Sequence, residues 1–296
     1  MSADPATGTA STIAQGPSAG RLGLERVLRQ PSAVIGSIIV AVVLALALTG
    51  PHLTTYAFDE TDLLNTLRPP SAEHWLGTDR LGRDILSRLI VGARTSLLVA
   101  GAVLTITLLI GVTTGMIAGY VGGRLDAVLM RAVDVMLGFP EVIFAILVAA
   151  ILGPGTGTVI VALALVWWTG IARLTRSLVL VLRSELFVDA AIVSGTPMPL
   201  ILWRHLLPNI VAPILVRASV GVGFIIMAEA TLSFLGLGIQ EPQASWGGMI
   251  RDGLPILRSD PYLALFGSIA LGTTIIGFNL LGDGLRDILD PRLQGR

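Results

Sequence analysis

Long apolar runs constrain the fold of this chain more than any other feature of its sequence. The first spans residues 33–49 and, at ~1.5 Å per residue, is about long enough to cross the hydrocarbon of a bilayer. Only helices and closed barrels satisfy backbone polar groups in lipid, and these runs are too long for barrel strands. The sequence therefore predicts an all-α polytopic membrane protein with six transmembrane helices. The five later runs are residues 96–120, 127–152, a run from 158 through Trp167-Trp168, 210–230 and 262–281.

The composition agrees with lipid as the main solvent. Hydrophobic residues make up 53% of the 296 residues, charged residues only 14%, and the mean hydropathy is +0.80. A soluble domain has about 25% charged residues. Twenty basic and twenty acidic residues cancel, so nothing in the net charge favours binding to nucleic acid.

Missing residue types exclude several kinds of chemistry. The chain has no Cys and no Lys, so it has neither a thiolate nucleophile nor the lysine of a Walker A ATP-binding loop. Its three histidines, His52, His74 and His205, do not form the His-x-x-x-His pair of a helical zinc site. We therefore expect no catalytic residue, no cofactor and no metal in this chain.

The arginines predict how the chain crosses the membrane. Residues 1–30 are rich in small and polar residues and are predicted to form a disordered cytoplasmic tail. More arginines lie on the cytoplasmic side when both termini are placed there, although the cluster from Arg80 to Arg94 opposes this orientation. A cleaved signal peptide ending near Ala45-Leu46-Ala47 is the alternative for the first run; the long leader and the later runs favour a retained span.

The orientation assigns particular residues to each side. It puts Thr156 and Ser245 outside, and Arg183 and Ser194 inside. The longest polar interruption on the inside spans residues 173–209.

Within this interruption, Pro199 favours the start of a short helix at residues 200–203, and Pro208 is expected to end it. Gly195 lies where a compact turn is needed. Taken alone, such a stretch also fits an ordinary cytoplasmic connection.

The motif Asp189-Ala190-Ala191, then Gly195, then Leu207-Pro208 resembles the EAA loop of the permease subunits of ABC importers. In that family the loop forms a coupling helix that sits in a cleft of the ATPase subunit. Glu is usual where this chain has Asp189, and many members have Ile in place of His205, although the His-x-Leu-Pro-Asn pattern resembles the peptide-importer branch. The resemblance implies a coupling loop at residues 185–209 that includes Asp189, Ala190, Ala191, Gly195, Leu200, Trp203, Arg204, His205, Pro208 and Asn209.

Further blocks resemble the same DppC/OppC branch in order along the chain. They are Gly77-Thr78-Asp79 with residues 81–84 and 87–88, Ala228-Glu229-Ala230 with 232–238 and 245–247, and 278–287 with Asp290-Pro291-Arg292. The resemblance implies the fold of an ABC type I importer permease. It divides the chain into the tail at 1–30, a first transmembrane helix with an external segment at 31–95, and a permease core with five transmembrane helices at 96–296.

The resemblance also implies partners and a mechanism. The partners are a second permease of the DppB/OppB type, two ATPases of the DppD/DppF or OppD/OppF type that bind ATP and Mg, and an external substrate-binding protein. The assembly would lie in the lipid bilayer of the bacterial cytoplasmic membrane and work by alternating access. The cargo implied is a di- or oligopeptide, with nickel chelates and glutathione as alternatives.

Two other classes of function remain to be weighed. A secondary transporter is suggested by the membrane carboxylates Asp134, Glu141 and Glu229, because such groups often mark ion paths. The alternative is that these carboxylates have structural roles, in which Asp134 pairs with Arg131 and Glu229 contacts a neighbouring subunit. A membrane enzyme is disfavoured because no nucleophile with a base is present.

Three residues near the outer ends of the spans are candidates for the pathway or its gate: Glu229, Ser233 and Trp246. Residues 245–255 are expected to form a short outer helix. This helix is either a cap on the bundle or a docking surface or gate for the binding protein.

Overall fold

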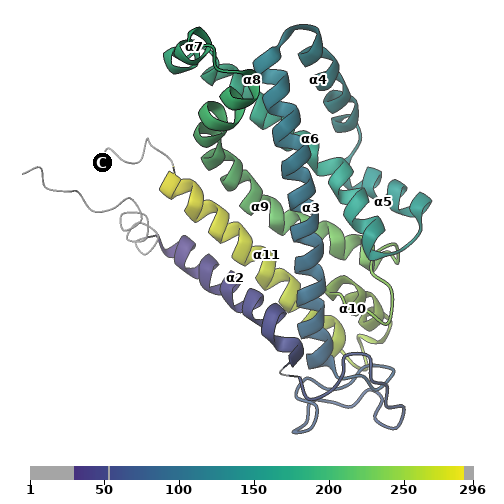
Figure 1. Cartoon of the computed structure of the whole chain (residues 1–296). Coiled ribbons are helices and arrows are strands. Elements are labelled where there is room, and N and C mark those ends of the chain that lie inside the picture. Colours follow the sequence, from purple (N-terminus) through teal and green to yellow (C-terminus); the bar gives the residue numbers. More distant parts are fainter. Residues whose placement is uncertain (1–29, 53, 290–296) are drawn as a thin grey trace, which may run out of the picture.

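The computed structural model describes residues 30–52 and 54–289, and within them every regular element is a helix (Figure 1). Most of the predicted tail and the Asp290-Pro291-Arg292 block lie outside the described residues. The elements are α2 (Pro31–Thr49), η1 (Gly50–His52), α3 (Ile85–Val121), α4 (Gly123–Leu137), α5 (Glu141–Leu152), α6 (Thr156–Leu182), α7 (Leu186–Val193), α8 (Met198–Leu200), the π-helix η2 (Ile201–Leu206), α9 (Leu207–Phe234), α10 (Trp246–Gly253), η3 (Leu254–Ile256) and α11 (Tyr262–Leu289).

Five helices in the described residues are long and apolar enough to cross a membrane, and α4 with α5 makes a sixth span if this bent pair is counted as one. The five are α2, α3, α6, the continuous helix from Met198 to Phe234 that contains α9, and α11. The prediction of an all-α, multi-pass membrane protein is confirmed.

The third predicted run, residues 127–152, is not one straight helix. It consists of α4 and α5, whose axes differ by 87°. Pro140 is the N-cap of α5, and Gly138 closes α4. A proline disfavours helical geometry at the residue before it and offers no N–H to the preceding turn, so the chain turns here instead of continuing.

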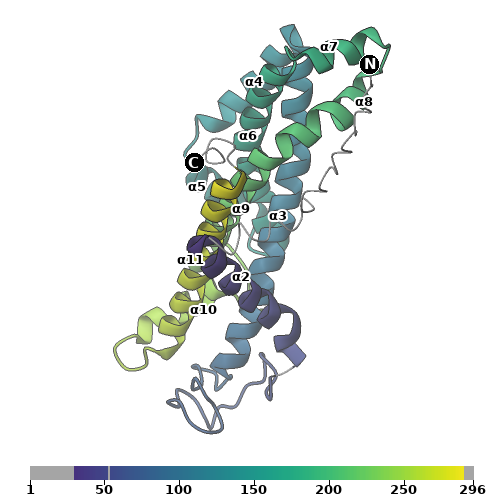
Figure 2. The same cartoon turned by 90° about the vertical axis from the view of Figure 1, so that its left-hand side faces the viewer.

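Close glycine contacts hold the long helices together. On α3, Gly111, Gly115 and Gly119 face α6 at intervals of four residues, and a Cβ at Gly115 would lie only 2.5 Å from the carbonyl oxygen of Ala172. The backbones of α3 and α6 therefore touch, as in small-residue packing between membrane helices. The same holds for α2 and α11, which lie side by side in both views (Figures 1 and 2), since a Cβ at Gly36 would meet the Leu281 nitrogen.

The molecule has two distinct ends. The α7–α8 region and the C-terminal end of α3 lie at one end, whereas residues 54–84, α10 and the start of α3 lie at the other (Figures 1 and 2). Each end has its own apolar core: Leu202, Leu206 and Ile210 belong to the first, and Trp246, Met249 and Leu263 to the second. The first end holds the predicted coupling loop and the second the predicted gate residues.

Candidate functional site

The predicted coupling loop is a short helix, a tight turn and a second helix that runs into the membrane. The helix α7 ends in a Schellman motif: the N–H of Thr196 donates to the carbonyl of Ala191 at 3.0 Å, and the N–H of Gly195 to that of Ile192 at 2.9 Å. Gly195 has a φ of +74°, which L-residues with side chains rarely adopt. The glycine thus lies in the compact turn that its position predicts.

The second half of the loop differs from the prediction. Instead of a short helix that Pro208 ends, the chain continues helically from Met198 to Phe234. The wider π-helix η2 precedes the proline, and the N–H of Leu207 donates to the carbonyl of Leu202, five residues back. Asn209 donates its side-chain amide to the carbonyl of His205 at 2.6 Å. The wider turn accommodates the proline ring, so the helix need not stop.

One face of the loop is buried in the protein, and the opposite face is exposed. Val188, Ala191, Ile201 and Leu202 pack into the apolar core at this end, against residues of α3 and α6. The opposite face exposes large apolar side chains, which are Leu186, Phe187, Ile192, Val193, Leu200 and Trp203. Val193 is 88% exposed and Leu186 84%, and an apolar patch of this kind on a protein surface marks an interaction site.

The loop residues predicted from the sequence lie on both the buried and the exposed face. Ala191 is buried, and His205 is partly buried. The remaining eight are exposed; they are Asp189, Ala190, Gly195, Leu200, Trp203, Arg204, Pro208 and Asn209. Most of the set therefore lies on the surface that a partner can reach.

The pathway candidates Glu229 and Ser233 lie inside the subunit. Glu229 is fully buried: its Oε2 accepts a hydrogen bond from the Ser96 hydroxyl on α3, and its Oε1 one from the Ser233 hydroxyl, both at 2.8 Å. Ser233 Oγ also accepts the N–H of Ile239 at 3.2 Å. The expectation that Glu229 contacts a neighbouring subunit is wrong, because its carboxylate is enclosed by its own chain and joins α3 to α9.

Trp246 is buried in the same region and 2% exposed. Its indole Nε1 donates to the carbonyl of Leu89 at 3.0 Å, and its ring lies against Gly92. The short helix expected within residues 245–255 is present as α10, and the hydroxyl of its N-cap Ser245 accepts the N–H of Gly248. The structure thus brings Glu229, Ser233 and Trp246 to one packed junction of α3, α9 and α10.

The segment before α3 is held by an ion network that joins the buried Asp79, Arg83 and Arg88 to the exposed Glu241. Asp79 accepts the Arg83 Nε at 2.7 Å, Arg83 Nη2 donates to Glu241 at 2.7 Å, and Arg88 lies 3.5 Å from Asp79. Burial raises the pKa of Glu241, but the hydrogen bond and charge of Arg83, with the charges of Arg88 and Arg251, outweigh it and leave the pKa below its usual value. The network ties this segment to the loop between α9 and α10.

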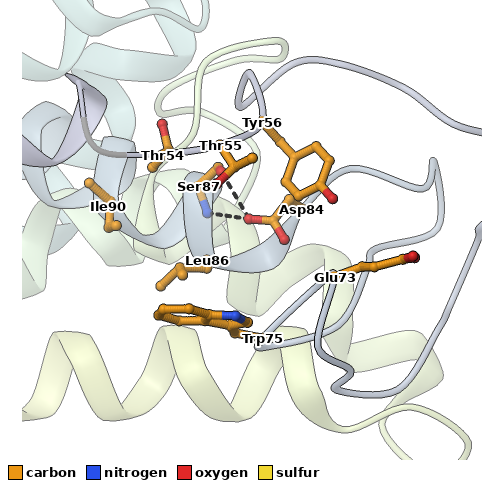
Figure 3. Close-up of a pocket in the computed structure, with 9 residues that line it drawn as sticks. All are labelled: Thr54, Thr55, Tyr56, Glu73, Trp75, Asp84, Leu86, Ser87 and Ile90. Atoms are coloured by element: carbon orange, nitrogen blue, oxygen red, sulfur yellow. Dashed lines mark hydrogen bonds between the residues drawn. The ribbon is translucent and has the colours of Figure 1, made fainter.

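Asp84 connects the same segment to the first turn of α3. Its Oδ2 accepts the N–H and the hydroxyl of Ser87, both at 2.8 Å, and so caps the helix. Its Oδ1 lies 3.0 Å from His74 Nδ1, and the centroid of the His74 ring lies 4.5 Å from that of Tyr56, with the two rings tilted by 32°. A hollow of about 90 Å³ opens beside this cap, with Glu73 and the exposed Trp75 on its wall (Figure 3).

The other membrane carboxylates lie elsewhere. Asp134 forms an ion pair with Arg173 of α6 and not with Arg131, because α4 packs against α6. Glu141 is exposed at the first turn of α5. The prediction of an Asp134–Arg131 pair is wrong.

Sequence reasoning missed two features that the structure shows. Asp126 of α4 accepts both Arg176 Nε and Nη2 of α6, and no local signal links residues fifty positions apart. The second is the close contact of α3 with α6, which the four-residue spacing of Gly111, Gly115 and Gly119 indicates locally. No cluster of three or more His, Cys, Asp or Glu side chains that could hold a metal occurs between residues 30 and 289, residue 53 excepted.

The fold and these sites define a class, a helical membrane protein with a surface loop at one end and, at the other, a segment that ion pairs hold to the bundle. Residues 111–295 match the family described as binding-protein-dependent transport system inner membrane component. Residues 18–70 match the N-terminal transmembrane domain of oligopeptide transport permease C. The chain belongs to the binding-protein-dependent transport permease family.

Relatives agree over nearly the whole chain. The dipeptide transport system permease protein DppC of Alkalihalophilus pseudofirmus is 42% identical over 274 residues, 93% of this chain and 90% of the relative. The oligopeptide transport system permease protein OppC of Bacillus subtilis is 41% identical, over 88% of this chain and 86% of the relative. The glutathione transport system permease protein GsiD of Pectobacterium atrosepticum is also 41% identical, over 91% and 90%.

Proposed function

We propose that the chain is the permease subunit of an ATP-driven importer of di- or oligopeptides. The exposed apolar face of the loop at residues 185–209 is the observation that supports this function most directly. A surface of exposed Leu, Phe, Val and Trp side chains needs a protein partner, and in this family that partner is the ATPase.

The proposed assembly has one copy of this chain, a second permease, two ATPases that bind ATP and Mg, and a binding protein outside the cytoplasmic membrane. The absence of any Lys supports ATP hydrolysis by another chain, because a Walker A loop needs one. Closure of the ATPases would press on α7, and the continuous helix from Met198 would pass the movement into the membrane.

The proposed orientation places the α7–α8 end and both termini in the cytoplasm. Residues 54–84 and α10 then face outwards, where a binding protein docks. The ion network of Asp79, Arg83 and Glu241 supports a docking surface there, because it fixes the external segment to the bundle.

The peptide cargo is supported by the names of the relatives, several of which are dipeptide or oligopeptide permeases. Glutathione is the second candidate, since a glutathione permease is equally similar. Uptake of labelled dialanine, glutathione and a nickel chelate by the reconstituted importer separates these cargoes. A secondary transporter is disfavoured, because Glu229 and Asp134 are both occupied by contacts within the chain.

The variant Gly195→Trp tests the coupling role. Among the described residues, no atom outside its immediate neighbours lies within 4 Å of a Cβ at this glycine, so the indole would project from the loop towards the ATPase. Gly123→Trp is a matched control at the same end, because Gly123 also has positive φ and open space around it. Both variants carry a similar backbone strain of about 1–2 kcal/mol.

We expect Gly195→Trp to lower ATP-driven uptake by at least about tenfold, while Gly123→Trp stays close to the parent chain. Uptake is measured in proteoliposomes that contain the whole importer, after co-purification shows that both variants reach the membrane. Parent-like uptake by an assembled Gly195→Trp importer would contradict the coupling role.

A further inference from the structure

Arg217 places a positive charge inside the span formed by α9. It is exposed on the surface of the chain, and within residues 30–52 and 54–289 it makes neither an ion pair nor a hydrogen bond. It lies ten residues beyond Leu207, about 15 Å along the helix at ~1.5 Å per residue. An arginine at such a depth faces water or protein, because lipid does not solvate its charge.

The guanidinium does not reach back to the nearer end of the helix. Its Nη1 lies 3.9 Å from the Cβ position of Gly221, one turn deeper in the span. Its Nη2 lies 3.8 Å from the Cβ position of Gly170 on α6. Arg217 therefore does not extend towards the nearer membrane surface, as arginines near span ends do.

The guanidinium lines a depression where α3, α6 and α9 meet. Thr107 of α3 lines it too, and this residue is 2% exposed with a buried hydroxyl that makes no hydrogen bond among the described residues. Trp167 adds an aromatic wall and pairs with Phe224 at 6.0 Å. The depression has a volume of about 10 Å³, so it has room for one polar atom of a ligand and not for a whole small molecule.

Both polar groups need the same kind of ligand. The guanidinium offers only donors, and the threonine hydroxyl can donate as well. A carboxylate accepts from both and supplies the missing negative charge.

We propose that Arg217 and Thr107 form a binding site, within the membrane, for the carboxylate of the peptide in transit. This inference rests on the proposed function, since it names a contact of that same cargo. Dipeptides, oligopeptides and glutathione, the cargoes in the relatives' names, all have a free carboxylate. The two glycines beside the guanidinium leave it accessible from the surface of the chain.

The first test uses a thiol placed beside the guanidinium. The chain has no Cys, and a Cβ at Gly170 would meet only Arg217, at an ordinary contact distance. Gly170→Cys is prepared in the whole importer and treated with an anionic and a cationic methanethiosulfonate reagent of similar size. Leu165→Cys is the control, because Leu165 is 42% exposed on a different face of the same helix.

We expect the anionic reagent to modify Gly170→Cys at least about threefold faster than the cationic one, and this preference to disappear in Gly170→Cys/Arg217→Gln. Leu165→Cys should show no preference for the anion. An unreactive Gly170→Cys, or one without anion preference, would show that lipid or an acidic residue of the second permease covers Arg217, and would overturn the proposal.

The second test measures uptake of labelled dialanine by the importer with its binding protein. Arg217→Gln should lower uptake at least about tenfold, and Arg217→Lys should retain more of it because the charge remains. Arg124→Gln, at an exposed arginine of α4, is the control. Parent-like uptake by Arg217→Gln would overturn this proposal and leave the proposed function intact. If the parent importer takes up no peptide, the proposed function is contradicted, and the anion preference of Gly170→Cys still tests the site.

Discussion

Glu229 shows how a single buried side chain can join two membrane helices. Its carboxylate accepts hydrogen bonds from Ser96 on α3 and from Ser233 one turn along α9. Hydrogen bonds between membrane helices contribute about 0.6–2 kcal/mol each. The residue resembles an ion-path carboxylate in sequence, but its position in the structure indicates a structural role.

Substitution of Glu229 separates these roles. Glu229→Ala leaves Ser96 without its partner across the helix contact, so we expect the purified importer to lose about 1–3 kcal/mol of stability. Glu229→Gln keeps an amide that can bond both hydroxyls, and it should keep near-parental stability and uptake. Thermal unfolding followed by size-exclusion chromatography measures the loss of stability in Glu229→Ala. Loss of uptake by a stably assembled Glu229→Gln importer would contradict the structural role.

At the scale of elements, the contact between α3 and α6 depends on glycine. A Cβ at Gly115 would lie 2.5 Å from a backbone oxygen of α6, whereas nothing lies within 4 Å of a Cβ at Gly101 on the same helix. Overpacking of this kind typically costs about 1–3 kcal/mol, and more where backbone must move. Gly115→Leu should therefore sharply lower the yield of folded importer.

Gly101→Leu is the matched control and should leave that yield unchanged. Detergent-solubilised importer is quantified by fluorescence-detected size-exclusion chromatography for both variants. Equal yields for Gly115→Leu and the parent chain would show that α3 and α6 do not pack as described.

The spanning helices were predictable because their signal is local. An apolar run forms a helix in lipid whatever surrounds it, and so the runs predicted α2, α6, α9 and α11 and most of α3. The start of α3 at Ile85 was missed, because Ser87 and Arg88 are buried by protein contacts and not by lipid. Hydropathy does not detect partners such as Asp79 that lie before the helix.

The same distinction applies to the loop. The turn at Gly195 follows from one residue's own backbone preference, so the sequence predicted it. The helix through Pro208 depends on a π-turn and on the packing of Leu202 and Leu206, which no local rule contains. The Asp134–Arg173 pair was missed because it depends on the packing of α4 against α6, and no local signal links residues 39 positions apart.

For the whole molecule, the residues found at its two ends predict how the chain is oriented in the membrane. Thr156 contacts Gln243 at the end that holds α10, and Ser194 lies in the turn after α7 at the opposite end. Gln243 and Ser194 are both exposed, so single cysteines at these positions can be labelled with an impermeant maleimide. We expect Gln243→Cys to react and Ser194→Cys to react only after permeabilisation, and the reverse pattern would invert the proposed orientation.

The central claim is that this chain transports peptide only as part of an ATP-driven complex. The decisive measurement is uptake of labelled dialanine into proteoliposomes that contain this chain alone, or this chain with the second permease, the ATPases and the binding protein. Uptake should require the full set and ATP, and should be insensitive to an imposed proton gradient. ATP-independent, proton-driven uptake by the chain alone would contradict the claim and identify a secondary transporter.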